Sequence, residues 1–310
     1  MFKFLSAFDC QRVCRRAPRA HSTLRGVCFG LFFAASSAFG AAEALDVAPG
    51  VAGILETPAS GDTRGAVLLI HGWNGHKDEV GDLYKDLAES LADAGLASLR
   101  FDFTGEGPQN DFVVSSTYAQ RIAEAEAAFA LLRERVPGVP MGANGFSLGG
   151  FVAMTLAGRH PDWFDTIVLW SAASRMDFSG GDPAMVAAVQ RALAEGEGVY
   201  ETWEKLTLTR EFIVSYLGKD ASRGLERYPG SLLAIRGTAD YLPALDRDWI
   251  AATPGRNDAV IYIDGADHIF NVLDQPKPDY GPRAIAHSVE WLSARLAPRS
   301  EDQGSNASGA

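Results

Sequence analysis

The sequence predicts an α/β protein built around a mostly parallel, doubly wound sheet. Short apolar runs rich in β-branched residues alternate with longer stretches that have helical spacing. The short runs are almost continuously apolar, as expected of strands that are covered by helices on both faces. In this class of fold, ligands bind at the carboxyl ends of the strands, so the residues that follow each strand are the first candidates for a functional site.

The expected elements follow one another in regular order. The expected strands are 66–70, 97–101, 139–146, 166–170, 231–235 and 259–263. The expected helices are 83–94, 118–135, 148–158, 246–252 and 282–296. In the second of these helices, Ile122, Ala125, Phe129 and Leu132 recur at helical spacing, while acidic residues occupy the other face.

One stretch interrupts the alternation. From Ser171 to Pro229 the sequence holds helical pieces and several glycines but no clear strand. A structureless connection of this length is uncommon in a compact domain. We therefore expect a helical cap, at about residues 171–229, inserted over the ends of the strands.

The first 42 residues have the pattern of an export signal. Lys3 and five arginines precede an uncharged run, 26–42, that is rich in small residues at its end. The run is shorter than the roughly 20 apolar residues that a membrane span needs. We expect cleavage near Gly40–Ala42 and a periplasmic or secreted protein, with an uncleaved membrane anchor as the alternative. The predicted domain is 43–297, and the polar segment 298–310 is expected to be disordered.

The net charge and the positions of the cysteines exclude several classes of partner and site. The leader has six Lys or Arg and one Asp, which gives it a net charge of +5. Because the whole chain has a net charge of −11, the chain without the leader has a net charge of −16. This sign argues against nucleic acids and anionic membranes as partners. All three cysteines, Cys10, Cys14 and Cys28, lie in the leader, which excludes a disulfide, a thiolate metal site and a cysteine nucleophile in the rest. We find no cluster of metal ligands and expect no cofactor.

The motif with the clearest chemistry is Gly145-Phe146-Ser147-Leu148-Gly149-Gly150. It follows an expected strand and precedes an expected helix. Glycines on both sides of one serine allow a turn that is too sharp for larger side chains, and such a turn exposes the serine hydroxyl. Alone, this pattern is also compatible with an ordinary tight turn.

Polar residues follow the other strands as well. The strand 66–70 leads into His71-Gly72-Trp73-Asn74-Gly75, and the strand 97–101 into Asp102-Phe103-Thr104-Gly105-Glu106-Gly107. The strand 231–235 is followed by Arg236-Gly237-Thr238-Ala239-Asp240, and the strand 259–263 by Asp264-Gly265-Ala266-Asp267-His268. The fold would thus bring Ser147, an acid and a histidine to one edge of the sheet.

With these motifs, residues 50–297 resemble the α/β-hydrolase superfamily of serine hydrolases. The pieces HGWNG, RFDFTGEG, GFSLGG, RGTAD and GADHIF stand in the order of that family, and Ser147, Asp240 and His268 keep its Ser…Asp…His order. The resemblance implies that His268 acts as the base for Ser147 and that Asp240 orients His268. It also implies an oxyanion hole formed by the main-chain N–H groups of Trp73 and Leu148.

Other residues remain possible at some of these positions. For the histidine, His71, His76, His160 and His287 compete with His268, but a structural hydrogen bond is the expected role of His71. For the acid, Asp264 and Asp267 compete with Asp240. Asp102 is expected to organise its own turn.

The resemblance extends, less specifically, to small carboxylesterases of the feruloyl and cinnamoyl esterase type. It implies a small-molecule ester as substrate. We single out His76 near the site and the cap aromatics Phe178, Trp203 and Phe212 as candidates for substrate binding. The alternative for the aromatic residues is that they form the core of the cap.

Three functions remain open at this stage. The first is cleavage of carboxylic esters through an acyl-enzyme intermediate. The second is cleavage of peptides or thioesters by the same three residues. The third is a binding protein that uses a hydrolase scaffold without catalysis.

Overall fold

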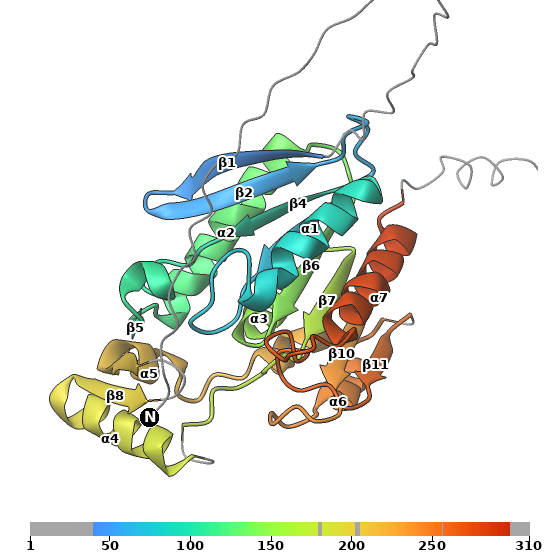
Figure 1. Ribbon diagram of the computed structural model, residues 1–310. Helices are drawn as coiled ribbons and strands as arrows, with labels where there is room; N and C mark the ends of the chain where they lie inside the picture. Colours follow the sequence, from blue (N-terminus) through green and yellow to red (C-terminus); the bar gives the residue numbers. More distant parts are fainter. Residues whose placement is uncertain (1–39, 179–181, 202–204, 256, 298–310) are drawn as a thin grey trace, which may run out of the picture. The chain divides into compact units, whose positions relative to one another are not determined.

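The structure is a computed structural model of the chain, and it describes residues 40–178, 182–201, 205–255 and 257–297. The main sheet has eight strands in the order β1-β2-β4-β3-β6-β7-β10-β11 (Figure 1). These strands are β1 (Ala41–Ala48), β2 (Val51–Thr57), β3 (Gly65–Ile70), β4 (Leu96–Phe101), β6 (Met141–Phe146), β7 (Thr166–Trp170), β10 (Ser231–Gly237) and β11 (Ala259–Ile263). The six strands from β4 to β11 in this order run parallel to one another, which confirms the mostly parallel sheet.

The antiparallel edge of the sheet is not predicted by the sequence pattern. There β2 pairs with β4, and β1 pairs with β2 from Ala41 opposite Thr57 onward. The first four residues of β1 are exposed, and its sequence AAEALDVA has no continuous apolar run. Because an edge strand of this kind is defined by its partner rather than by burial, its own sequence carries little signal.

Helices cover both faces of the sheet, and the side chains of β3 show how the two layers are divided. Ala66, Leu68 and Ile70 belong to one core cluster, together with residues of α2 (Tyr118–Arg135) and α3 (Leu148–Arg159). Val67 and Leu69 belong to the other, together with α1 (Leu83–Asp93) and α7 (Tyr280–Arg295). This alternation explains why the strand is apolar at every position.

The insertion between β7 and β10 is a mixed α/β cap, so the expectation of a purely helical cap is wrong. It comprises α4 (Pro183–Glu195), β8 (Glu197–Glu201), β9 (Lys205–Thr209), α5 (Arg210–Tyr216) and the 3₁₀ helix η3 (Ala221–Arg227). A second, three-stranded sheet has the order β5-β9-β8, in which β5 (Val113–Val114) belongs to the segment after β4 (Figure 1). A two-residue strand has no sequence signal of its own, so this pairing could not be expected from the pattern.

The remaining helix of the main domain, α6 (Asp246–Ala252), begins nine residues after β10. None of the helices in the described ranges is both long enough and apolar enough to cross a bilayer. Most of the predicted export signal, and the segment 298–310, lie outside those ranges. Because β1 begins at Ala41, cleavage after Gly40 would leave this strand whole, whereas cleavage after Ala42 would remove its first two residues.

Candidate active site

Ser147 occupies the sharp turn between β6 and α3. Its backbone has φ 52° and ψ −115°, a conformation that costs a non-glycine residue about 1–3 kcal/mol. The glycines beside it permit the turn. A Cβ atom at Gly145 would lie 2.5 Å from the carbonyl oxygen of Gly149, and a Cβ atom at Gly149 would collide with the carbonyl oxygen of Ile70. The strand–turn–helix element predicted around Ser147 is therefore present.

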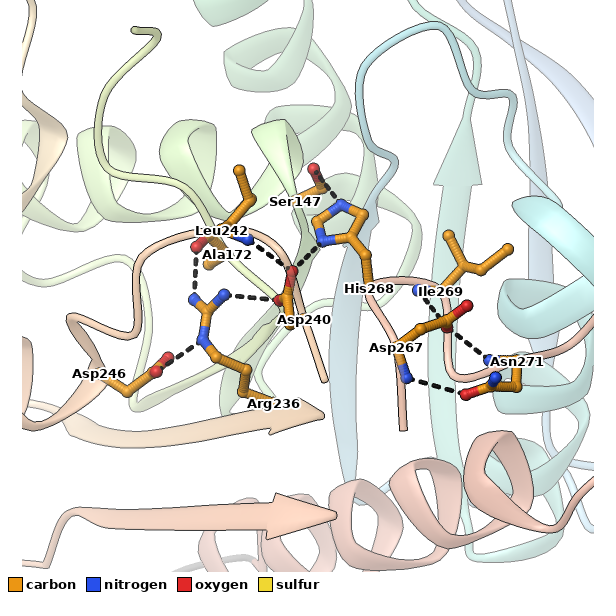
Figure 2. A network of polar contacts seen from close by, with 10 residues as sticks. All are labelled: Ser147, Ala172, Arg236, Asp240, Leu242, Asp246, Asp267, His268, Ile269 and Asn271. Atoms are coloured by element: carbon orange, nitrogen blue, oxygen red, sulfur yellow. Dashed lines mark hydrogen bonds and ion pairs between the residues drawn. The ribbon is translucent and has the colours of Figure 1, made fainter. Parts of the chain in front are cut away.

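Two hydrogen bonds join Ser147, His268 and Asp240 (Figure 2). The Nε2 atom of His268 lies 3.0 Å from Ser147 Oγ, and its Nδ1 atom lies 2.8 Å from Asp240 Oδ1. The three residues follow β6, β11 and β10, whose carboxyl ends meet at one edge of the sheet because the strands are parallel. The structure thus brings together the three residues that the sequence singled out.

The Asp240 side chain is fully buried, and it determines the orientation of the ring. Burial raises the pKa of Asp240, but the hydrogen bond and charge of His268, the Leu242 N–H and the charge of Arg236 together lower it below its ordinary value. An ionised carboxylate only accepts hydrogen bonds, so Nδ1 of His268 is the donor to Asp240. In a neutral imidazole with its proton on Nδ1, the Nε2 atom can accept a proton from Ser147.

Arg236, near the end of β10, holds the second oxygen of Asp240. Its Nη1 atom lies 2.6 Å from Asp240 Oδ2, and its Nε atom lies 2.6 Å from Asp246 Oδ2 (Figure 2). Its Nη2 atom donates to the carbonyl oxygen of Ala172, also at 2.6 Å. The guanidinium therefore joins the loops after β7 and β10 to the start of α6.

The two acids that competed with Asp240 have other partners. Asp267 accepts hydrogen bonds from the main-chain N–H groups of Ile269, at 3.0 Å, and Asn271, at 2.7 Å (Figure 2). Asp264 accepts from the Thr238 hydroxyl at 3.1 Å. Both carboxylates are thus bound within or beside their own turn, in agreement with the preference for Asp240.

The competing histidines lie in structural positions. His71 is buried, its Nδ1 lies 2.8 Å from the carbonyl oxygen of the next residue, and its Nε2 accepts from the Phe103 N–H at 3.0 Å. Burial, and then the positive charge of Arg121, lower the pKa of His71 well below its ordinary value. His71 is therefore neutral and supports the turn, as expected. His160 stacks on Trp163, with 3.7 Å between ring centroids.

The loop after β3 holds Trp73 between two anchored peptide groups. The Gly72 N–H donates to Glu79 Oε1 at 2.5 Å, and the Asn74 N–H donates to Glu106 Oε2 at 2.9 Å. In the described part of the chain, no acceptor is found for the N–H of Trp73 itself. This arrangement leaves the Trp73 N–H available, and its role as an oxyanion donor stays a prediction.

The Leu148 N–H is the first of α3, directly after Ser147. The first N–H groups of a helix have no partner within it, and they lie at the positive end of the helix dipole. A developing negative charge beside Ser147 would be stabilised at this position. As for Trp73, its oxyanion role is a prediction that agrees with this geometry.

Glu79 and Glu106 are buried carboxylates that the sequence analysis did not recognise as parts of the site. Burial raises the pKa of Glu79 to about 7, although the N–H groups of Gly72 and Val80 oppose the shift. Burial also raises the pKa of Glu106, while its ion pair with Arg121 lowers it. The partners of Glu106 come from other segments, and the partners of Glu79 are main-chain N–H groups that leave no pattern in the sequence.

The residues proposed for substrate binding lie in different surroundings. His76 is half-buried in the loop after β3, and its Nδ1 accepts from the N–H of Asp78 at 3.3 Å. Phe178 and Phe212 are buried in the core cluster that includes α2 and α3. Phe212 also stacks on Trp73, with 6.2 Å between ring centroids. The buried location of both rings agrees with the alternative that they form the core of the cap rather than bind substrate. Trp203 lies outside the described residues.

Tyr241 is a neighbour of the site that the sequence analysis missed. It directly follows Asp240, its ring centroid lies 4.7 Å from that of His268, and 78% of its surface is exposed.

No group of three or more His, Cys, Asp or Glu side chains is arranged to hold a metal ion within the ranges that the structure describes.

Comparison with known families gives one match. A family model described as serine aminopeptidase, S33, matches residues 61–221, a little over half of the chain. The matched region includes the loop after β3, the Ser147 turn and most of the cap.

Several curated proteins match parts of the chain. A pimeloyl-[acyl-carrier protein] methyl ester esterase of Chromobacterium violaceum is 28% identical over 58% of this chain and 65% of its own length. A thermostable monoacylglycerol lipase of a Bacillus species is 29% identical over 31% of this chain and 36% of its own length. The chain therefore spans less than two thirds of either relative.

Solved structures with the same fold cover more of the chain. Est1E from Butyrivibrio proteoclasticus with bound ferulic acid has a TM-score of 0.65 and is 16% identical, over 82% of this chain and 99% of that protein. At this identity the likeness concerns the fold alone.

Proposed function

The chain belongs to the serine aminopeptidase S33 family within the α/β-hydrolases, and on that premise we propose that it hydrolyses carboxylic esters through an acyl-enzyme intermediate. Ser147 is the nucleophile, His268 the general base and acid, and Asp240 the residue that orients His268. The proposal rests above all on the imidazole of His268, which bridges Ser147 Oγ and Asp240 Oδ1.

In the first half of the reaction, the Ser147 hydroxyl oxygen attacks the ester carbonyl carbon while Nε2 of His268 takes its proton. The carbonyl oxygen becomes an oxyanion, which accepts hydrogen bonds from the N–H groups of Leu148 and Trp73. Collapse of this tetrahedral species breaks the bond to the alcohol oxygen, which receives the proton from His268. The acyl group then remains on Ser147.

In the second half, water replaces the alcohol. His268 removes a proton from the water, whose oxygen attacks the acyl carbon, and a second oxyanion forms in the same place. The Ser147 oxygen leaves with the proton from His268, and the carboxylic acid is released. Asp240 keeps its proton-free state throughout and stabilises the imidazolium that forms in each half.

The first test compares the wild-type protein with Ser147→Ala on p-nitrophenyl esters of graded acyl length. We expect kcat/KM to fall by on the order of 10⁴-fold or more, because the nucleophile is removed while the fold is kept. Ser90→Ala, in the exposed part of α1, is the matched control and should keep wild-type activity. Equal activity of Ser147→Ala and wild type would contradict the proposal.

A second candidate function is cleavage of amides or thioesters, because the matching family model is described as a serine aminopeptidase. Matched ester, thioester and aminoacyl-amide substrates with the same acyl group would distinguish the candidates. We expect the ester to have the highest kcat/KM. A higher value for the aminoacyl amide would replace the ester proposal with a peptidase.

A binding protein without catalysis is distinguished by labelling. A fluorophosphonate probe should label the wild-type protein and not Ser147→Ala, because only an activated serine reacts with it. Absence of labelling in folded wild-type protein would favour the binding function.

For the substrate, we propose a small ester with an apolar or aromatic acyl group. The partly buried ring of Trp73 and the exposed ring of Tyr241 belong to the loops of the proposed site, and the solved structure of a fold neighbour contains ferulic acid. A series of acyl lengths that includes one hydroxycinnamate ester tests this proposal. A flat series without preference for the aromatic ester would remove the aromatic part of it.

The proposal for the location is export, based on the pattern of residues 1–42. Expression of the full chain, followed by fractionation and N-terminal sequencing, would show a mature protein that begins near Gly40–Ala42. An intact N-terminus in the membrane fraction would favour the uncleaved anchor.

A further inference from the structure

A buried ion pair lies directly behind the acid of the proposed active site. The side chain of Arg236 is 1% exposed, and those of Asp240 and Asp246 are fully buried. Burying three charges carries a large desolvation cost, and replacing such groups by apolar residues is often neutral or stabilising. Because this cluster is not expected to add stability, we expect a functional role for the charges next to Asp240.

The hydrogen bonds divide the two oxygens of Asp240 between different tasks. Oδ1 accepts hydrogen bonds from Nδ1 of His268 at 2.8 Å and from the Leu242 N–H at 3.0 Å, whereas among the described residues Oδ2 accepts only from Nη1 of Arg236. The same guanidinium is held by Asp246 and by the carbonyl of Ala172, so its Nη1 donor has a fixed position and restricts the plane of the Asp240 carboxylate. This plane decides whether Oδ1 points at the imidazole.

The same guanidinium supports the nucleophile side of the site. Its Nη2 atom donates to the carbonyl of Ala172, and the N–H of the next residue, Ala173, donates to the carbonyl of Ser147 at 3.1 Å. Arg236 thus connects the segment that holds Ser147 to the acid that orients His268 (Figure 2).

Asp246 has a narrower role. Its Oδ2 accepts from Nε of Arg236, and its Oδ1 is buried without a hydrogen-bond partner among the described residues. Its evident contribution is therefore its charge. Without that charge, the positive charge of Arg236 would offset the negative charge of Asp240 that stabilises the imidazolium of His268.

We propose that Arg236 and Asp246 are positioning residues for the proposed hydrolase reaction: Arg236 orients the Asp240 carboxylate, and Asp246 cancels the charge of Arg236 so that Asp240 keeps its full effect on His268. The inference rests on the proposed function, since it concerns the same site. Neither residue touches the substrate.

Besides Asp240, the side chains around His268 include the apolar ring of Phe146, whose centroid lies 5.4 Å from that of the imidazole, and three polar groups. Ser147 lies at Nε2, the exposed ring of Tyr241 lies beside the imidazole, and the Asp267 carboxylate is bound in its own turn. These groups are unchanged in the variants below, so a change in the pH profile reports on the charge of the Arg236–Asp246 pair.

The test measures kcat, KM and the pH profile of kcat/KM on a p-nitrophenyl ester for Asp246→Asn. This change leaves Arg236 uncompensated and makes the imidazolium less stable. We expect the acidic limb of the profile to move down by about one pH unit and kcat to fall about tenfold, with KM nearly unchanged. In the double variant Arg236→Met/Asp246→Asn the net charge is restored, so the limb should return to the wild-type position while kcat stays low.

The matched control is Glu56→Gln. Glu56 is also a buried carboxylate bound to an arginine, Arg100, at 2.9 Å, and Arg100 keeps a second partner, Asp78, just as Arg236 keeps Asp240. Its loss should lower stability in a similar way and leave the pH profile unchanged. If the acidic limb of the kcat/KM profile lies at the same pH in the wild type, Asp246→Asn and Glu56→Gln, the proposal is overturned.

Two conservative variants guard against a fold defect. Asp246→Glu keeps the charge and should keep the wild-type limb. Arg236→Lys also keeps the charge but loses the planar contact, so kcat should fall about tenfold with the limb in place; a moved limb in either variant would contradict the assignment. If wild-type protein shows no Ser147-dependent hydrolysis, the proposed function itself fails. If it is active and only the variants disagree, the positioning role alone fails.

Discussion

At the level of single residues, Glu79 couples the loop around Trp73 to pH. It is buried, its two oxygens accept the N–H groups of Gly72 and Val80, and its pKa is raised by burial to about 7. A carboxyl group whose pKa is higher in the folded than in the unfolded state binds its proton more tightly when folded. It therefore favours the folded state at low pH, and this contribution is lost as the pH rises from about 4.5 to about 7.

Glu79→Gln should remove this pH dependence. Relative to the variant, the wild-type protein should lose up to about 3 kcal/mol of unfolding free energy between pH 5 and pH 8. Denaturant unfolding of both proteins at the two pH values measures the difference. Glu89→Gln, at an exposed position of α1, should show no such change. A wild-type–variant gap that is equal at both pH values would show that Glu79 does not titrate in this range.

At the level of elements, the contact between α3 and β3 places the Leu148 N–H. This contact is close because Gly149 has no side chain, and a Cβ atom there would collide with the carbonyl oxygen of Ile70. The collision involves main-chain atoms, so it cannot be relieved by a side-chain rotation. The start of α3 would have to move away from the strand.

Gly149→Ala should therefore lower the unfolding free energy by about 2 kcal/mol or more and reduce kcat, because the shift displaces an oxyanion donor. The control is Gly142→Ala in β6, where a Cβ atom would mainly meet the movable side chains of Leu292 and Leu296 at 3.1 and 3.2 Å. Thermal unfolding and ester hydrolysis of both variants measure the effects. A Gly149→Ala protein as stable and active as Gly142→Ala would refute the close contact.

The elements also show how far the sequence is informative. The strands β3, β4, β6, β7 and β10 are buried on both faces, and the edge strand β11 is half-buried, so their apolar runs identify them. Ser147, Asp240 and His268 could be predicted because each lies in the turn that follows a strand of this group. In contrast, β1, β8 and the two-residue β5 depend on their partners, and their own sequences carry little information. The same holds for Arg236 with Asp246, and for Glu79 with Gly72, whose relation exists only in the folded chain.

At the level of the whole molecule, residues 40–297 contain the complete main sheet, its covering helices and the proposed catalytic residues. We propose that this range folds by itself. A protein limited to it should have a Tm within about 2 °C of the full chain and kcat/KM within about twofold.

The matched variant is residues 49–297, which lacks β1 and leaves the edge of β2 unpaired. It should have a lower Tm and a greater tendency to aggregate. Differential scanning calorimetry and light scattering of both proteins provide the comparison. A protein of residues 40–297 that fails to fold would show that the outer segments are required.

The pairing of β5 with β9 has a consequence for engineering. The cap is attached to the main domain not only by its two chain ends but also by Val113 and Val114, which belong to the segment between β4 and α2. A chimera that exchanges residues 171–229 alone would bring in a new β9 beside the old β5. Substrate preference should therefore be transplanted with both segments, 105–116 and 171–229, as one discontinuous module.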